Sequence, residues 1–165
     1  MKKGEKRKQE LLKIAYQLFI EKGYENTSVD EIIATAGIAK GTYYYYFPSK
    51  EATLEAVIEL MIHEEVQRAK KVLQSSLPVS QKFIAVIAAF RPTENEAGIA
   101  KTIDATENFL MHNRVNQRIT KEAIPFLVEV TKEGIEKKVF DCNHIEERVK
   151  MLLILGQQAF DEGKY

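Results

Sequence analysis

The sequence predicts an all-α protein, in which a small helical head is followed by a second helical domain. Helix-breaking residues are few, with eight glycines and four prolines among 165 residues. Apolar residues recur at intervals of three and four, which is the spacing of one face of a helix, rather than in strict alternation. Three short helical patterns lie within the first 50 residues, and a glycine separates the second from the third. That arrangement is typical of a helix-turn-helix.

Local signals place the first two helices. The first is expected at 6–22, where apolar residues share one face and Gly23 follows the last turn. The second opens at Ser28, which has the spacing of a capping box with Glu31. Gly37 is expected to end it.

The third helix is expected at 40–47, because a residue that precedes a proline is pushed out of helical geometry and residue 48 is proline. Ser49 then caps a long fourth helix that reaches residue 73 or 77. These four helices account for nearly half of the chain.

Beyond Pro78 the pattern is less distinct. The run 83–90 is apolar all round, which predicts a buried helix. A loop is expected at 91–96, and two or three helices across 95–138, one of which Pro125 either starts or kinks. The last helix, 143–160, carries small residues on its apolar side. A second helix therefore has room to approach closely, either from another copy or from the same domain.

Charge and cysteine content narrow the functional classes. The chain has 24 basic and 24 acidic side chains, but the first 50 residues carry nine basic and six acidic ones. This segment suits a polyanion, although a solvated basic first turn has the same composition. The single cysteine, Cys142, excludes an intrachain disulfide. No signal peptide is recognised, and the longest apolar run is too short to span a bilayer, so we expect a cytoplasmic protein with no membrane partner.

Residues 37–47 combine a glycine turn with a lysine, a threonine and four tyrosines. Because positions four apart share a helix face, Tyr43 and Phe47 are expected in the core of the head. Tyrosine hydroxyls and lysines contact phosphate, and a threonine methyl contacts the thymine methyl group. An aromatic patch that binds another protein is the alternative. The face expected to meet DNA comprises Lys40, Gly41, Thr42, Tyr44 and Tyr45, with Tyr46 at its edge.

Two flanking positions extend this surface. Lys50, at the start of the next helix, is within reach of a neighbouring phosphate. The N-terminal amides of the second helix, at Ser28 and Val29, attract anions through the helix dipole.

Residues 6–54 resemble the N-terminal domain of TetR-family (tetracycline-repressor-like) transcriptional regulators. The resemblance implies DNA contacts from Ser28, Lys40, Thr42, Tyr44, Tyr45, Tyr46 and Lys50. It also implies an all-helical regulatory domain that binds a small molecule, and a homodimer that places two third helices on a palindromic operator. The matching residues are Ala15, Leu18, Phe19, Gly23, Tyr24, Thr27, Ser28, Val29 and Ile32, followed by the whole run 36–51.

The sequence departs from the family in two places. Ala39 stands where a small hydroxyl residue is frequent, so a cap or phosphate contact from that side chain is missing. The family's final helix is absent or short here, although the family's dimer interface normally uses it. We expect a DNA-binding domain at 1–48 and a regulatory and dimerisation domain at 49–165.

We therefore expect a ligand-responsive regulator of transcription, a repressor that binds double-stranded DNA and is released by a small molecule. We expect an apolar or aromatic effector. The alternative is a helical adaptor that uses the aromatic patch for protein binding. The expected ligand-binding residues are Met61, Phe83, Ile87, Phe90, Asn108, Phe109, Met111, His112 and Phe126.

An enzyme is not expected. His63, Glu64 and Glu65 lack the second histidine of a zinc protease motif. Cys142 and His144 could join His112 or His63 at a metal, but their spacing fits no familiar ligand set. We expect no catalytic residues, no metal and no cofactor.

Overall fold

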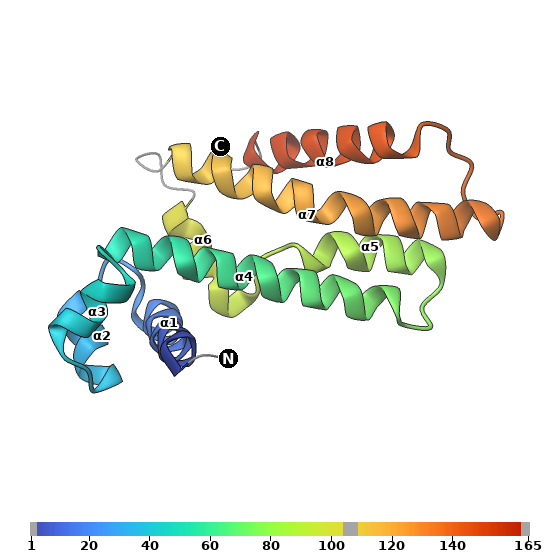
Figure 1. Cartoon of the computed structure of the whole chain (residues 1–165). Coiled ribbons are helices and arrows are strands. Elements are labelled where there is room, and N and C mark those ends of the chain that lie inside the picture. Colours follow the sequence, from blue (N-terminus) through green and yellow to red (C-terminus); the bar gives the residue numbers. More distant parts are fainter. Residues whose placement is uncertain (1–2, 104–108, 163–165) are drawn as a thin grey trace. The chain divides into compact units, whose positions relative to one another are not determined.

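The computed structural model describes residues 3–103 and 109–162, and every regular element in these ranges is a helix (Figure 1). The all-α prediction is thus confirmed. The chain divides into two compact units. Unit 1 comprises Met1–Met61 and Pro92–His112, and unit 2 comprises Ile62–Arg91 and Asn113–Tyr165. This division by packing falls inside a helix, whereas the expected boundary after residue 48 is one of function and stays a prediction.

Unit 1 begins with the expected three helices and the start of a fourth. Ser28 caps α2, since its Oγ accepts a hydrogen bond from the Glu31 amide at 3.1 Å. Ser49 caps α4 in the same way, by accepting from the Ala52 amide at 3.1 Å. Both caps satisfy backbone N–H groups that a helix leaves free at its start. The helices are α1 (Lys3–Lys22), α2 (Val29–Ala36), α3 (Lys40–Tyr46) and α4 (Lys50–Leu73), of which the last enters unit 2.

The core of unit 1 takes one apolar stripe from each helix. In α1 the buried positions recur at intervals of three and four, as the periodicity predicted. Thr27 closes the connection between α1 and α2, because its buried hydroxyl meets the carbonyls of Leu18 and Gly23 at 3.3 and 2.9 Å. The buried apolar side chains of these helices within unit 1, with Phe47 directly after α3, are Leu11, Ala15, Leu18, Phe19, Ile32, Tyr43, Phe47, Leu54, Val57, Ile58 and Met61.

The loop expected at 91–96 is partly helical. A 3-10 turn, η1 (Glu94–Glu96), leads directly into α6 (Ala97–Ile103), and Thr93 caps the turn. Glu96 is 1% exposed and accepts hydrogen bonds from the Tyr16 hydroxyl at 2.8 Å and from the Thr93 amide at 2.7 Å. A buried carboxylate is stable only when it is hydrogen-bonded in this manner. The contact binds a segment from the middle of the chain to α1.

Unit 2 contains the end of α4, α5 (Val79–Ala89), most of α7 (Phe109–Glu136) and α8 (Ile145–Glu162). Pro125 lies inside α7 and starts no helix. The core is one hydrophobic cluster to which all four helices contribute. Its buried members are Ala69, Val79, Val86, Ala89, Phe90, Ala123, Leu127, Val130 and Val149.

The prediction that 83–90 is buried on all sides is wrong. Val86 is fully buried, but Ile84 on the same helix is 68% exposed. Because a helix turns 100° per residue, only one stripe of α5 reaches the core. The apolar side expected for the last helix is likewise divided: Val149 is buried, whereas Leu152 is 46% exposed.

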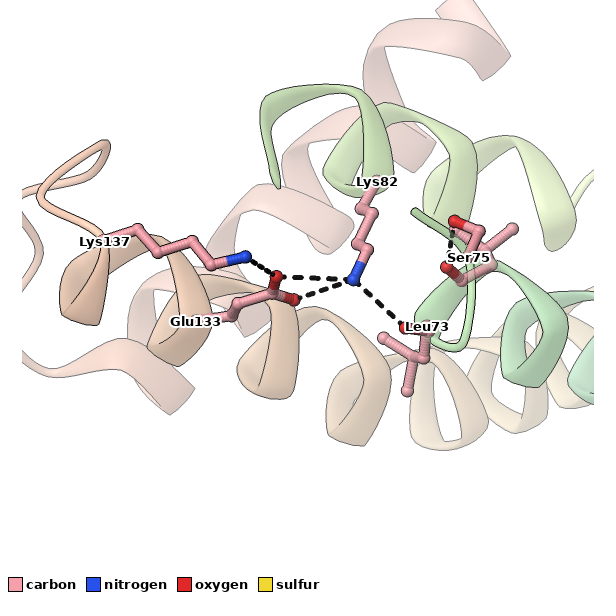
Figure 2. Close-up of polar contacts among 6 residues, drawn as sticks. Leu73, Ser75, Lys82, Glu133 and Lys137 are labelled. Carbon is pink, nitrogen blue, oxygen red and sulfur yellow. Dashed lines mark hydrogen bonds and ion pairs between the residues drawn. The ribbon is translucent and has the colours of Figure 1, made fainter. Parts of the chain in front are cut away.

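Lys82 is a charged side chain in the interior of unit 2 (Figure 2). Its Nζ donates to the Leu73 carbonyl at 3.1 Å, at the end of α4, and to both oxygens of Glu133 on α7 at 3.3 and 3.1 Å. Lys137, directly after the end of α7, donates to the same carboxylate. The ammonium has three donors, and these acceptors replace the water that burial removed. One side chain of α5 thereby joins the ends of two other helices.

None of the helices in the described residues is both long enough and apolar enough to cross a membrane.

We predict that Gly134→Ala destabilises unit 2 by about 1–3 kcal/mol, since the added methyl overlaps the ring of Phe140, which packs on Phe83. Urea unfolding followed by circular dichroism measures the loss. Gly98→Ala is the matched control, because a Cβ at this helical position meets nothing within 4 Å and alanine favours the helix. Equal stability of the two variants would contradict the packing described here.

The hydrogen bonds from Lys137 and Lys82 hold the pKa of Glu133 below its ordinary value of 4.5. A lowered carboxylate pKa contributes stability that is present above pH 4.5 and is lost as the pH falls through the folded-state value. Glu133→Gln should therefore weaken the dependence of unfolding free energy on pH between pH 5 and pH 3. Glu129→Gln, one turn earlier and exposed, is the control and should leave that dependence unchanged.

Candidate nucleic-acid interface

A tight turn separates α2 from α3. Gly37 has φ +59°, in the left-handed region, and its N–H donates to the Ala34 carbonyl at 3.2 Å. The Ile38 amide donates to the Ile33 carbonyl at 3.3 Å, so the last carbonyls of α2 are satisfied. A Cβ on Gly37 would meet no atom within 4 Å, so the backbone conformation rather than space favours glycine. Ala39 begins α3 without a side-chain cap, as expected.

Tyr43 fixes the rotation of α3. Its ring is fully buried, and its hydroxyl lies 2.6 Å from the Thr53 Oγ1, itself buried, on α4. Phe47 is 2% exposed and lies against Tyr43, with 6.0 Å between the ring centroids. The expectation that these two aromatic side chains belong to the core is confirmed. Burial also raises the pKa of Tyr43 above its ordinary value.

The other tyrosines of α3 lie outward as a consequence. Tyr45 is 81% exposed and Tyr44 is 44% exposed. Tyr46 is half-buried, and its ring meets that of Tyr45 edge to face with 5.0 Å between centroids. Gly41 and Lys40 are exposed, and Thr42 is half-buried. The structure therefore brings the predicted residues of α3 together on one short helix, where Tyr46 lies at the margin.

The lysines of this region already have partners within the protein. Lys40 donates to the Asp30 carboxylate at 3.2 Å. Lys50 donates to the Glu25 carbonyl at 3.4 Å and lies 4.1 Å from the centroid of the Tyr24 ring. These contacts were not foreseen from the sequence, although the acidic first turn of α2 was a visible signal.

Electrostatic effects follow from these contacts. Lys22 pairs with Glu31, and the hydrogen bond between them raises the pKa of the lysine and lowers that of the glutamate. Burial, together with the negative charge of Glu51, raises the pKa of Tyr24 to about 12. Tyr24 is therefore a neutral ring beneath the Lys50 ammonium, which is the arrangement of a cation–π contact.

The remaining expected contact, Ser28, is exposed at the start of α2. Its Oγ already accepts the Glu31 amide hydrogen, so the hydroxyl hydrogen alone is left to donate to a phosphate.

A small cleft also opens in the head, which the sequence did not indicate. Its volume is ≈ 210 Å³, below the roughly 300–1,000 Å³ of sites for drug-sized ligands. Residues of α1, of the end of α2, of the turn that follows and of α3 line it: Arg7, Glu10, Leu11, Ile14, Ala36, Ile38 and Tyr46.

The residues expected to bind an effector are divided between the two units. Met61, Met111 and His112 belong to unit 1. Phe83, Ile87, Phe90 and Phe126 belong to unit 2, where they form or adjoin the hydrophobic core. Asn108 and the side chain of Phe109 lie outside the described residues. A ligand-binding role for this set stays a prediction.

No three His, Cys, Asp or Glu side chains are grouped as a metal site would require in the part of the chain that the structure describes. The alternative that joined Cys142 and His144 to a further histidine is therefore not supported.

Comparison with known proteins agrees with this site. Residues 11–57 match the family model described as bacterial regulatory proteins, tetR family. The uncharacterized HTH-type transcriptional regulator YuxN of Bacillus subtilis is 48% identical over 153 residues, which cover 90% of this chain and 46% of YuxN. The chain thus spans about half the length of that relative. The HTH-type transcriptional repressor KstR2 of Rhodococcus jostii is 29% identical over 77% of this chain and 59% of its own.

The fold is shared with solved structures. A TetR-family transcriptional regulator from Pectobacterium atrosepticum superposes with a TM-score of 0.75 at 18% identity, over 91% of this chain and 77% of that chain. These three proteins are described as regulators and none as an enzyme, in agreement with the sequence. The match of residues 11–57 and the relatives above thus support a regulator of the tetR family.

Proposed function

We propose that the protein regulates transcription by binding duplex DNA with α3 in the major groove. The observation that carries this proposal is the single outward face of α3, where exposed Tyr44 and Tyr45 stand beside Lys40. Exposed aromatic side chains need a partner, and the turn before α3 fits a recognition helix.

Each residue of the surface has a chemical role in this proposal. The hydroxyls of Tyr44, Tyr45 and Tyr46 donate to phosphate oxygens or base edges, and the Thr42 methyl meets a thymine methyl. Gly41 leaves space for the DNA backbone. The positions that hold flanking phosphates are Ser28, Lys40 and Lys50.

Binding as a homodimer to a palindrome is part of the proposal. Two heads then meet half-sites about 34–36 Å apart, one helical turn of DNA. The apolar side chains that α8 exposes support self-association: Met151, Leu152, Ile154 and Leu155, between 42% and 60% exposed.

The proposal also includes a small-molecule effector. The effector binds the regulatory domain and releases the repressor from DNA. Such coupling is typically about 1–3 kcal/mol. An apolar or aromatic molecule suits the aromatic contacts of unit 2, where the Phe90 and Phe126 rings lie 5.8 Å apart.

Selection from a randomised duplex library, followed by titration of the selected duplex at several salt concentrations, tests DNA binding. Lys40→Gln should weaken binding about three- to tenfold and reduce the salt slope by about one for each head bound, since one phosphate contact is lost. Lys121→Gln, an exposed lysine of α7, makes the same charge change and should leave the slope as it is. Equal slopes for the two variants, or no salt-dependent binding by the parent, would exclude the proposal.

Light scattering tests the dimer. Leu155→Lys places a charge on an α8 side chain that is 59% exposed and should convert the dimer to a monomer. Ile84→Lys, at a 68% exposed position of α5, is the control and should stay dimeric. A monomeric parent protein, or a dimer that withstands Leu155→Lys, would contradict the role given to α8.

A further inference from the structure

Lys40 has a competitor for phosphate within the head itself. Its Nζ lies 3.2 Å from Asp30 Oδ1 on α2, ten residues earlier in the chain. Both side chains stand largely in solvent, with exposed fractions of 65% and 78%. Such a pair is weak and forms and breaks easily. The ion pair therefore leaves Lys40 able to bind DNA, but the pair must break each time the lysine contacts a phosphate.

The residue after Asp30 also forms an ion pair with a lysine. Glu31 pairs with Lys22 at the end of α1, so the first turn of α2 places one carboxylate against each flanking lysine. A carboxylate at a helix N-terminus is favourable because it meets the positive end of the helix dipole. The helix dipole thus favours both carboxylates at these positions in the free head.

Resting on the proposed function, we propose that Asp30 is a positioning residue that competes with DNA phosphate for Lys40. When a phosphate takes the ammonium, Asp30 loses its partner and must recruit a cation from solution. That uptake offsets part of the counterion release that drives DNA binding. Asp30 consequently lowers affinity for any duplex and makes binding less sensitive to salt. A site must then offer good contacts along the rest of α3 to be occupied.

A double-mutant cycle tests this mechanism on the duplex selected by the parent protein. Asp30→Asn keeps the size of the side chain and removes its charge. It should raise affinity about two- to fivefold for each head bound and steepen the salt slope by up to about one. In the Lys40→Gln background the same change should have little effect, because the competed contact is gone.

Glu31→Gln is the matched control, since it removes an equal charge from the adjacent residue while its partner is Lys22. Its effect on affinity should be the same with Lys40 and with Lys40→Gln. Circular dichroism melts show whether each variant keeps its fold.

The outcomes are separable. A gain from Asp30→Asn that persists undiminished with Lys40→Gln would mean that Asp30 acts only through its general field, and the inference would be overturned. A loss of affinity from Asp30→Asn would show that Asp30 assists Lys40, which also overturns it. Absence of salt-dependent binding by the parent would instead refute the proposed function, and this inference with it.

Discussion

The geometry of the head depends on the burial of one tyrosine. Tyr43 fills the space between α3 and the start of α4, and its hydroxyl lies 2.6 Å from the Oγ1 of Thr53, which is itself buried. A ring of that size leaves no freedom to rotate α3 about its axis. Because each further residue turns the helix by 100°, Tyr44 and Tyr45 must then lie outward. The core contact and the exposed tyrosine surface are thus two consequences of the same packing.

The lysines of this surface contact other groups of the protein. The chain carries as many acidic as basic side chains, and Lys22, Lys40 and Lys50 each contact an acceptor or ring within unit 1. Contacts of this kind reduce the long-range attraction of the head for DNA, although its first 50 residues still carry nine basic and six acidic side chains. Recognition is left to short-range contacts, which are the ones that distinguish sequences.

Polar contacts buried in the helical units have a different role. Glu96 on the η1 segment and Lys82 on α5 are each surrounded by acceptors or donors that only their native neighbours supply. A misplaced helix would leave either charge buried without them, at a cost of several kcal/mol. These residues select one arrangement within each unit, whereas apolar packing alone tolerates several.

The sequence by itself determined the helical class, the turn between α2 and α3, the caps at Ser28 and Ser49, and the division of the tyrosines into buried and exposed. All of these follow from signals within a few residues, which the chain carries wherever it folds. Only the tertiary structure decided that Tyr16 meets Glu96 and that Lys82 meets Glu133, 80 and 51 residues apart. It also decided that Ile84 stays exposed and that Asp30 holds Lys40. Such contacts depend on which helix faces approach each other, and residue spacing does not encode that choice.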